Sequence, residues 1–180
     1  MLSPDPPPAV VAALRAAGCV FAEDEAALLA AAAASEHELD AMVTRRASGV
    51  PLEHVLGWAE FCGLRIAVGP GVFVPRRRTE CLVRHAIAAA PPRPVAVDLC
   101  CGTGAVAAAL AAALSLAELH AADLEPAAVG YARQNLAGTG AQVHQGDLYA
   151  ALPGTLRGRV DILAANVPYV PTGQLPLLPP

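Results

Sequence analysis

The spacing of apolar residues divides the chain into a helical first part and a second part in which strands and helices alternate. Residues 95–99, Val-Ala-Val-Asp-Leu, are apolar and rich in β-branched side chains, which predicts a buried strand. Residues 105–114 continue as an unbroken apolar run and predict a helix. Gly102 and Gly104 lie between them, where glycine permits backbone angles that other residues avoid. Strand, glycine turn and helix predict the first half of a nucleotide-binding βαβ unit.

The alternation continues after this unit and predicts a parallel, doubly wound sheet. Further strands are expected at 118–122, 141–145 and 160–165, with a helix at 126–137. In such a sheet, ligands bind at the carboxyl ends of the strands. Four polar residues fall at those ends: Asp98, Asp123, Asp147 and Asn166. Each alone would more often be a turn residue or a helix cap, but together they indicate a binding site.

The first fifty residues predict a small domain of three helices. Asp5-Pro6 is typical of a helix start. Acidic residues after Ala22 suit the first turn of a second helix, and residues 35–38, Ser-Glu-His-Glu, form a capping box for a third. The domain 1–50 is interpreted either as a packing appendage or as a docking unit for a partner.

Residues 51–75 change character because glycines and prolines break them into short apolar runs, such as 61–68 and 72–74. This pattern predicts a β-hairpin linker. A helix is expected from Thr79 to Ala90, followed by a break at the prolines of 91–94. The expected third domain is therefore 76–180.

Composition narrows the functional classes. The chain has 180 residues, 55% of them hydrophobic, which allows one sizeable core or two small ones. No run is both long and hydrophobic enough to span a bilayer, and the start lacks the basic segment of a signal peptide. The net charge of −4 argues against a broad nucleic-acid surface. The five cysteines form no Cys-x-x-Cys pair, so no disulfide framework and no metal site is expected, and the thiols are expected to be reduced in a cytoplasm.

The glycine turn by itself leaves two cofactors open. Gly102-x-Gly104-x-x-Ala107 fits the dinucleotide fingerprint, and Asp123 lies about where a ribose-binding acid belongs. Asp98, however, would repel a pyrophosphate, whereas its charge suits a ligand with an amino group and a sulfonium. Together with residues 166–169, Asn-Val-Pro-Tyr, this favours S-adenosylmethionine over NAD.

Several motifs together resemble a known family, the protein-(glutamine-N5) methyltransferases that modify the Gly-Gly-Gln loop of peptide-chain release factors. The matching segments are residues 46–57, 73–80 and 98–104, Asp123 with Asn135, and residues 166–169. The resemblance implies S-adenosylmethionine as the cofactor and a release factor as the protein substrate. It implies a Rossmann-like class I S-adenosylmethionine-dependent methyltransferase fold, preceded by an N-terminal helical domain that meets the release factor. The expected protein is a cytoplasmic monomer that binds neither membrane nor nucleic acid.

The chain departs from the family pattern in four residues and in length. Cys100 stands where the family's loop has its first glycine, Arg77 and Arg78 replace a proline and a glutamate, and Val167 replaces a proline. The sequence ends at Pro180, soon after the fourth expected strand, so the parallel sheet is expected to be incomplete, with an exposed edge. This suggests a divergent, C-terminally truncated member.

The motifs also predict roles for individual residues. The Oδ1 atom of Asn166 and the Val167 carbonyl would accept the two N–H bonds of a substrate amide, and Tyr169 would flank the amide plane. Pro168 keeps Val167 extended. The expected cofactor-binding residues are Asp98 at the amino group, Cys100, Gly102 and Gly104 along the methionine part, Asp123 at the ribose, Asp147 or Leu148 at the adenine, and Asn166.

Two alternatives stay open. The same Asn-Pro-Pro-Tyr-like motif serves enzymes that methylate amino groups of DNA adenine or of ribosomal RNA guanine. The other alternative is an inactive fragment or docking module that keeps the helical domain and half of the sheet, which would be poorly soluble and would transfer no methyl group.

Overall fold

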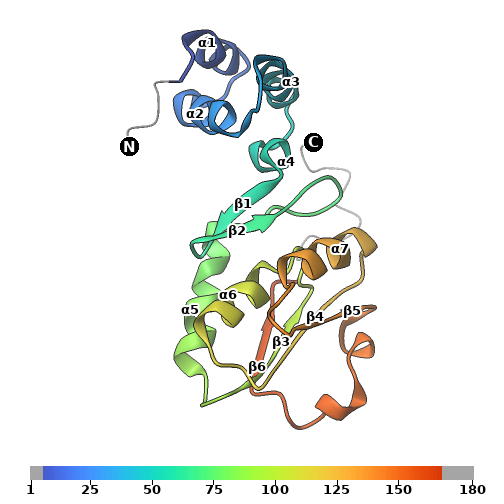
Figure 1. The fold of residues 1–180 in the computed structure, drawn as a ribbon. Helices are drawn as coiled ribbons and strands as arrows, with labels where there is room; N and C mark the ends of the chain where they lie inside the picture. Colours follow the sequence, from blue (N-terminus) through green and yellow to red (C-terminus); the bar gives the residue numbers. More distant parts are fainter. Residues whose placement is uncertain (1–5, 168–180) are drawn as a thin grey trace. The chain divides into compact units, whose positions relative to one another are not determined.

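The computed structural model describes residues 6–167, which form two compact units (Figure 1). The first unit comprises residues 6–60 and 65–74, and the second comprises residues 61–64 and 75–167. Pro168 and Tyr169, for which catalytic roles are predicted, lie outside the described residues.

The first unit is a bundle of short helices with its own core. Its helices are α1 (Pro8–Ala16), α2 (Ala22–Ala32), α3 (Glu36–Ala47) and α4 (Leu52–Leu56). The core is formed by the residues of these helices and their connections that are shielded from solvent: Val10, Leu14, Cys19, Ala22, Ala26, Leu29, Met42 and Val55. An ion pair joins two of the helices, because Arg46 donates through Nε and Nη2 to both carboxylate oxygens of Glu25 at 2.6 and 3.1 Å.

The capping box predicted for the third helix is present. The Ser35 Oγ accepts from the Glu38 N–H at 3.2 Å, and the Glu38 carboxylate accepts from the Ala34 N–H at 2.7 Å. The first helix begins after Pro7, whereas the predicted cap Asp5 lies outside the described residues.

The hairpin expected within 51–75 is formed by β1 (Trp58–Phe61) and β2 (Leu64–Ala67). The apolar run 61–68 contains the end of β1, the turn and the whole of β2. Cys62 and Gly63 both have positive φ, 50° and 74°, which is the conformation of a tight two-residue hairpin turn. Residues 72–74 form no strand, and α4 is a helix that the sequence pattern did not predict.

The second unit contains a parallel four-stranded sheet, as predicted. Its strands are β3 (Val95–Leu99), β4 (Glu118–Asp123), β5 (Gln142–Gln145) and β6 (Ile162–Ala165), in the order β5-β4-β3-β6. The helices are α5 (Glu80–Ala89), α6 (Ala105–Ala113) and α7 (Pro126–Asn135), all within two residues of the predicted bounds. Three short 3₁₀ turns complete the unit: η1 (Arg77–Thr79), η2 (Leu148–Ala151) and η3 (Gly154–Leu156).

The two faces of this sheet are covered differently. The helices α5, α6 and α7 pack together on one face, where Asp98 of β3 contacts the backbone of α6. The opposite face bears the alternate residues of β3, and its core contains Val95, Val97, Leu99, Ala122 and Leu156. The connection from β5 to β6, with η2 and η3, covers that face without an α-helix.

β6 lies at one side of the sheet. Among the described residues it pairs with β3 alone, and Leu163 is 47% exposed on the face that bears Val97. In the part of the chain that the structure describes, no helix is both long and apolar enough to cross a membrane.

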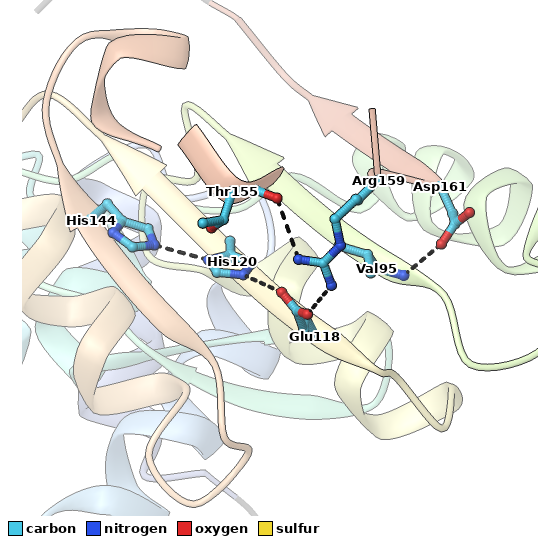
Figure 2. Close-up of polar contacts among 7 residues, drawn as sticks. All are labelled: Val95, Glu118, His120, His144, Thr155, Arg159 and Asp161. Carbon is cyan, nitrogen blue, oxygen red and sulfur yellow. Dashed lines mark hydrogen bonds and ion pairs between the residues drawn. The ribbon is translucent and has the colours of Figure 1, made fainter. Parts of the chain in front are cut away.

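A chain of polar side chains runs along the helix-free face at the amino-terminal end of the sheet (Figure 2). His120 is 2% exposed, and its Nδ1 lies 3.0 Å from the Nε2 of His144, while its Nε2 lies 3.5 Å from the Glu118 carboxylate. Glu118 forms an ion pair with Arg159, which precedes β6. The chain of contacts therefore links β5, β4 and the segment that leads into β6.

This arrangement predicts a loss of stability at acidic pH. A hydrogen bond between the two rings needs one donor nitrogen and one acceptor nitrogen. It is lost when the His120 Nδ1 and the His144 Nε2 both carry a proton. Burial first, then the charges of His120 and Arg133, lower the pKa of His144. A depressed folded-state pKa gives stability that is present above the unfolded value and is lost as pH falls below it.

The test is urea unfolding at pH 7.5 and 5.5. We expect His144→Gln, which keeps an amide donor for His120 but cannot titrate, to lose less stability on acidification than the unmodified chain. His85→Gln, at an exposed position of α5, serves as the control and should retain the full pH dependence. Equal pH dependence in both variants would contradict the assignment to His144.

Candidate functional site

The order of the strands brings two distant loops together. The chain moves from β3 to β4 and β5 on one side and then returns to place β6 on the other side of β3. Leu99 pairs with both Ala122 and Ala165, so the three strands end at the same level. Cys100 and Asn166 follow these ends directly. The reversal of strand order is where parallel sheets of this type bind their ligands.

The glycine turn after β3 has the left-handed geometry that its sequence predicts. Cys100, Gly102 and Gly104 have φ angles of 53°, 54° and 74°. The Gly104 N–H donates to the Cys101 carbonyl at 2.8 Å, and the Cys101 N–H donates to the Ala122 carbonyl at 3.1 Å. The turn is thus closed on itself and tied to the end of β4.

Asp123 at the end of β4 is bonded to this turn. Its Oδ2 accepts from the Gly102 N–H at 2.8 Å, and its Oδ1 accepts from the Glu125 N–H at 3.0 Å. The Asp123 backbone carbonyl accepts from the Gly146 N–H at 3.0 Å, which ties in the loop after β5. Asp123 therefore acts as a turn residue for three loops, and the predicted ribose contact would use the same half-buried carboxylate.

Asp98 is buried beneath the turn. The side chain is 2% exposed, and its Oδ2 accepts from the Ala107 N–H in the first turn of α6 at 3.0 Å. This bond satisfies one of the amide groups that a helix leaves unpaired at its start. Burial raises the pKa of Asp98 to about 7, partly offset by the Ala107 N–H, and the nearby Asp123 raises it further. A carboxylate kept in so unfavourable a place is typical of a functional site.

Three carboxylates lie near enough to Cys100 to affect its thiol. Its thiol is half-buried, and its pKa is raised by burial and by the charges of Asp123, Asp98 and Asp147. The site therefore holds carboxylates from the ends of three strands around one loop. Such a site favours a cationic or hydroxyl-rich ligand and disfavours a pyrophosphate.

The remaining predicted residues lie at the solvent side of the same edge. Asp147 and Leu148 follow β5, and Leu148 is exposed and has a positive φ of 43°. Asn166 and Val167 follow β6 and are exposed as well. The structure thus places all predicted residues up to Val167 at the carboxyl edge of one sheet, while their binding roles stay predictions.

Asn135 is a residue whose contact the sequence did not predict. It lies at the end of α7, and its Nδ2 donates to the Thr103 carbonyl in the glycine turn at 2.8 Å. The two residues are 32 positions apart, so no local pattern links them. The sequence signalled the importance of Asn135 only through its place, with Asp123, in a motif that resembles the family.

The positive φ of Cys100 predicts a stabilising substitution. Left-handed backbone costs a non-glycine residue about 1–2 kcal/mol, part of which glycine loses again through unfolded-state entropy. We expect Cys100→Gly to raise the free energy of unfolding by about 0.5–1 kcal/mol. Thermal and urea unfolding measure this, with Cys101→Gly as a comparison. Cys101 has no positive φ and is 8% exposed, so its replacement should destabilise, and two changes of the same sign would contradict the strain argument.

Comparison with known proteins identifies the second unit. A family described as "Methyltransferase domain" matches residues 96–176. The chain is 47% identical over 135 residues to a release factor glutamine methyltransferase of Mycolicibacterium smegmatis, covering 73% of this chain and 48% of the relative. It is 42% identical to the enzyme of that name from Streptomyces coelicolor, covering 72% of this chain and 47% of the relative.

One relative carries a different name. The chain is 41% identical to a 4-amino-L-phenylalanine/4-methylamino-L-phenylalanine methyltransferase of Streptomyces pristinaespiralis, covering 73% of this chain and 47% of the relative. In all three comparisons the chain spans about half the length of the relative. The predicted fold class is confirmed by the methyltransferase domain and the parallel sheet. The chain is therefore a homologue of the release factor glutamine methyltransferases, and its second unit holds a methyltransferase domain.

Proposed function

We propose that this chain binds S-adenosylmethionine and serves transfer of its methyl group to the side-chain amide nitrogen of a glutamine in a protein, the Gly-Gly-Gln loop of a peptide-chain release factor. The observation that carries the proposal is the set of carboxylates, Asp98, Asp123 and Asp147, around the glycine turn beside the end of β6. The names of the relatives support the choice of acceptor.

The residues present fit the cofactor. Asp98 and its neighbours supply negative charge for the ammonium and sulfonium groups, and Asp123 supplies acceptors for ribose hydroxyls. A Cβ at Gly102 would meet no atom within 4 Å, so this side of the turn is open. When bound, S-adenosylmethionine supplies an already activated methyl group. The chain therefore needs to position the acceptor more than to activate it.

Asn166 and Val167 would do that positioning. An amide nitrogen is a poor nucleophile because its lone pair is delocalised into the carbonyl. Two acceptors, the Asn166 Oδ1 and the Val167 carbonyl, would hold the two N–H bonds, turn the lone pair toward the methyl group and stabilise positive charge that develops on nitrogen. Both residues follow β6 at the level where the glycine turn follows β3. The acceptor would lose a proton to solvent after transfer.

The test is transfer of labelled methyl groups from S-adenosylmethionine to purified release factor, with a factor whose Gly-Gly-Gln glutamine is replaced by glutamate as the matched control. Label on the unmodified factor alone supports the proposal. DNA and ribosomal RNA are included as acceptors, and label on either of them but on no protein would refute it.

A small aromatic amine is a second candidate acceptor, favoured by the relative named for 4-amino-L-phenylalanine. The same assay with that amino acid distinguishes it. Binding of S-adenosylhomocysteine is measured alongside by calorimetry, against NAD. Cofactor binding without transfer to any acceptor would support the docking-module alternative for this chain, which spans about half of its relatives.

A further inference from the structure

The glycine turn is held from two sides by the elements that follow β3. Asp123, at the end of β4, binds the Gly102 N–H at 2.8 Å, and Asn135, at the end of α7, binds the Thr103 carbonyl at 2.8 Å. Thr103 itself is 2% exposed. A buried carbonyl without a donor would cost the free energy of its lost hydration. The Asn135 amide supplies that donor and so stabilises the turn in this conformation.

Helix α7 forms a surface that fits the turn closely. Ala132, Asn135 and Leu136 are spaced three and four apart and share one face of the helix. A Cβ added at Gly104 would lie 3.2 Å from the Ala132 Cα and 3.3 Å from the Leu136 Cδ1. The absence of a side chain at Gly104 therefore lets α7 approach near enough for Asn135 to reach the neighbouring carbonyl.

The bond from Asn135 fixes one peptide group of the turn at both of its polar ends. The Thr103 carbonyl accepts from Asn135, and the N–H of the same peptide group, on Gly104, donates to the Cys101 carbonyl. The orientation of this peptide plane sets the direction in which α6 starts, because Gly104 is the residue that caps α6. Asn135 thus binds this peptide group from outside the predicted ligand contacts.

We propose that Asn135 is a positioning residue for the cofactor-binding turn, which it holds in its ligand-binding shape through the Thr103 carbonyl. This rests on the proposed binding of S-adenosylmethionine. A bound ribose would share the Asp123 carboxylate with the Gly102 N–H and weaken that restraint. The hydrogen bond from Asn135 then supplies more of the restraint on the turn. Its loss therefore affects the protein with bound cofactor more than the protein without it.

The experiment compares two isosteric changes of amide to carboxylate on the same helix. Asn135→Asp cannot donate to the carbonyl and places negative charge against it, whereas Gln134→Glu makes the same chemical change at an exposed position. Calorimetry with S-adenosylhomocysteine at pH 8 should give an affinity at least tenfold lower for Asn135→Asp and within twofold of the unmodified chain for Gln134→Glu. Asn135→Gln, which keeps a donor, should recover part of the affinity.

Thermal unfolding and amide hydrogen exchange without ligand separate positioning from simple destabilisation. Positioning predicts faster exchange at the Gly104 amide. Because the Thr103 carbonyl loses its donor, the midpoint should fall moderately below that of Gln134→Glu, while the chain stays folded at the temperature of the calorimetry. Affinity within twofold of the unmodified chain for Asn135→Asp would overturn the inference, as would an affinity loss that only follows a large drop in the midpoint. Failure of the unmodified chain to bind S-adenosylhomocysteine would instead overturn the proposed function. In that case, unchanged exchange at the Gly104 amide in Asn135→Asp would show that Asn135 does not restrain the turn either.

Discussion

Replacing Asp98 by asparagine is expected to make the ligand-free protein more stable at pH 8 and to weaken cofactor binding at the same time. The side chain is 2% exposed, and its pKa is raised to about 7, first by burial and then by Asp123. A raised carboxyl pKa gives stability that is complete below the unfolded value and is lost as pH rises through the folded value. A shift from 3.8 to about 7 corresponds to a penalty of roughly 4 kcal/mol above pH 7. An asparagine keeps an acceptor for the Ala107 N–H and removes the buried charge.

Urea unfolding at pH 5 and pH 8 tests the first half of this prediction. The stability gained by Asp98→Asn over the unmodified chain should grow between the two values, since other titrating groups are common to both proteins. Asp161→Asn is the control, because Asp161 also accepts a backbone N–H, from Val95 at 2.8 Å, but is exposed (Figure 2). A variant at Asp98 that is less stable than the unmodified chain at pH 8 would show that the charge stabilises the start of α6 by more than its burial costs.

The second half concerns function. If the Asp98 charge is there for an ammonium or sulfonium group, its removal should lower the affinity for S-adenosylhomocysteine by tenfold or more. Gain of stability with loss of binding is the pattern that a functional residue shows when the fold alone would be better without it. A variant that binds with unchanged affinity would reduce Asp98 to a helix cap.

The predicted elements agree with the structure where local pattern determines them. The strands and helices of the second unit follow apolar runs bounded by glycine and proline, and the capping box at Ser35 begins a helix as expected. The order of the strands was not predicted, although right-handed connections between parallel strands leave few arrangements. The apolar pattern did not show where the hairpin turns within 61–68. Cys62 adopts a left-handed conformation there, which is uncommon for a residue other than glycine.

The candidate site could be predicted in position but not in its internal contacts. Strand ends are visible in the sequence, so Asp98, Asp123, Asp147 and Asn166 could be placed at one edge. Which of them serves the fold could not be inferred, because the partners of Asp98 and Asp123 are backbone groups brought near by tertiary packing. The contact from Asn135 to Thr103 depends on the approach of α7 to Gly104, a property of two packed elements and of neither alone.

Asn166 is the residue whose loss is expected to affect the proposed reaction most. Its side chain is exposed, so Asn166→Ala should change stability little. Removal of one acceptor that stabilises charge developing during transfer costs about 10²–10³-fold in rate. The rate of methyl transfer to a release factor should therefore fall by that factor, whereas the affinity for S-adenosylhomocysteine should fall far less.

Two further variants test whether the Asn166 oxygen is what the reaction needs. Asn166→Asp keeps an oxygen that can accept from the substrate amide, so it should retain more activity than Asn166→Ala if that bond is what matters. Gln145→Ala, an exposed change at the end of β5 with no assigned role, should leave the rate unchanged. A rate within threefold of the unmodified chain for Asn166→Ala would contradict the proposed grip on the amide. An equal loss in the aspartate and alanine variants would mean that the Asn166 amide group, and not only its oxygen, takes part, as expected if its Nδ2 must itself be held by the protein or the cofactor.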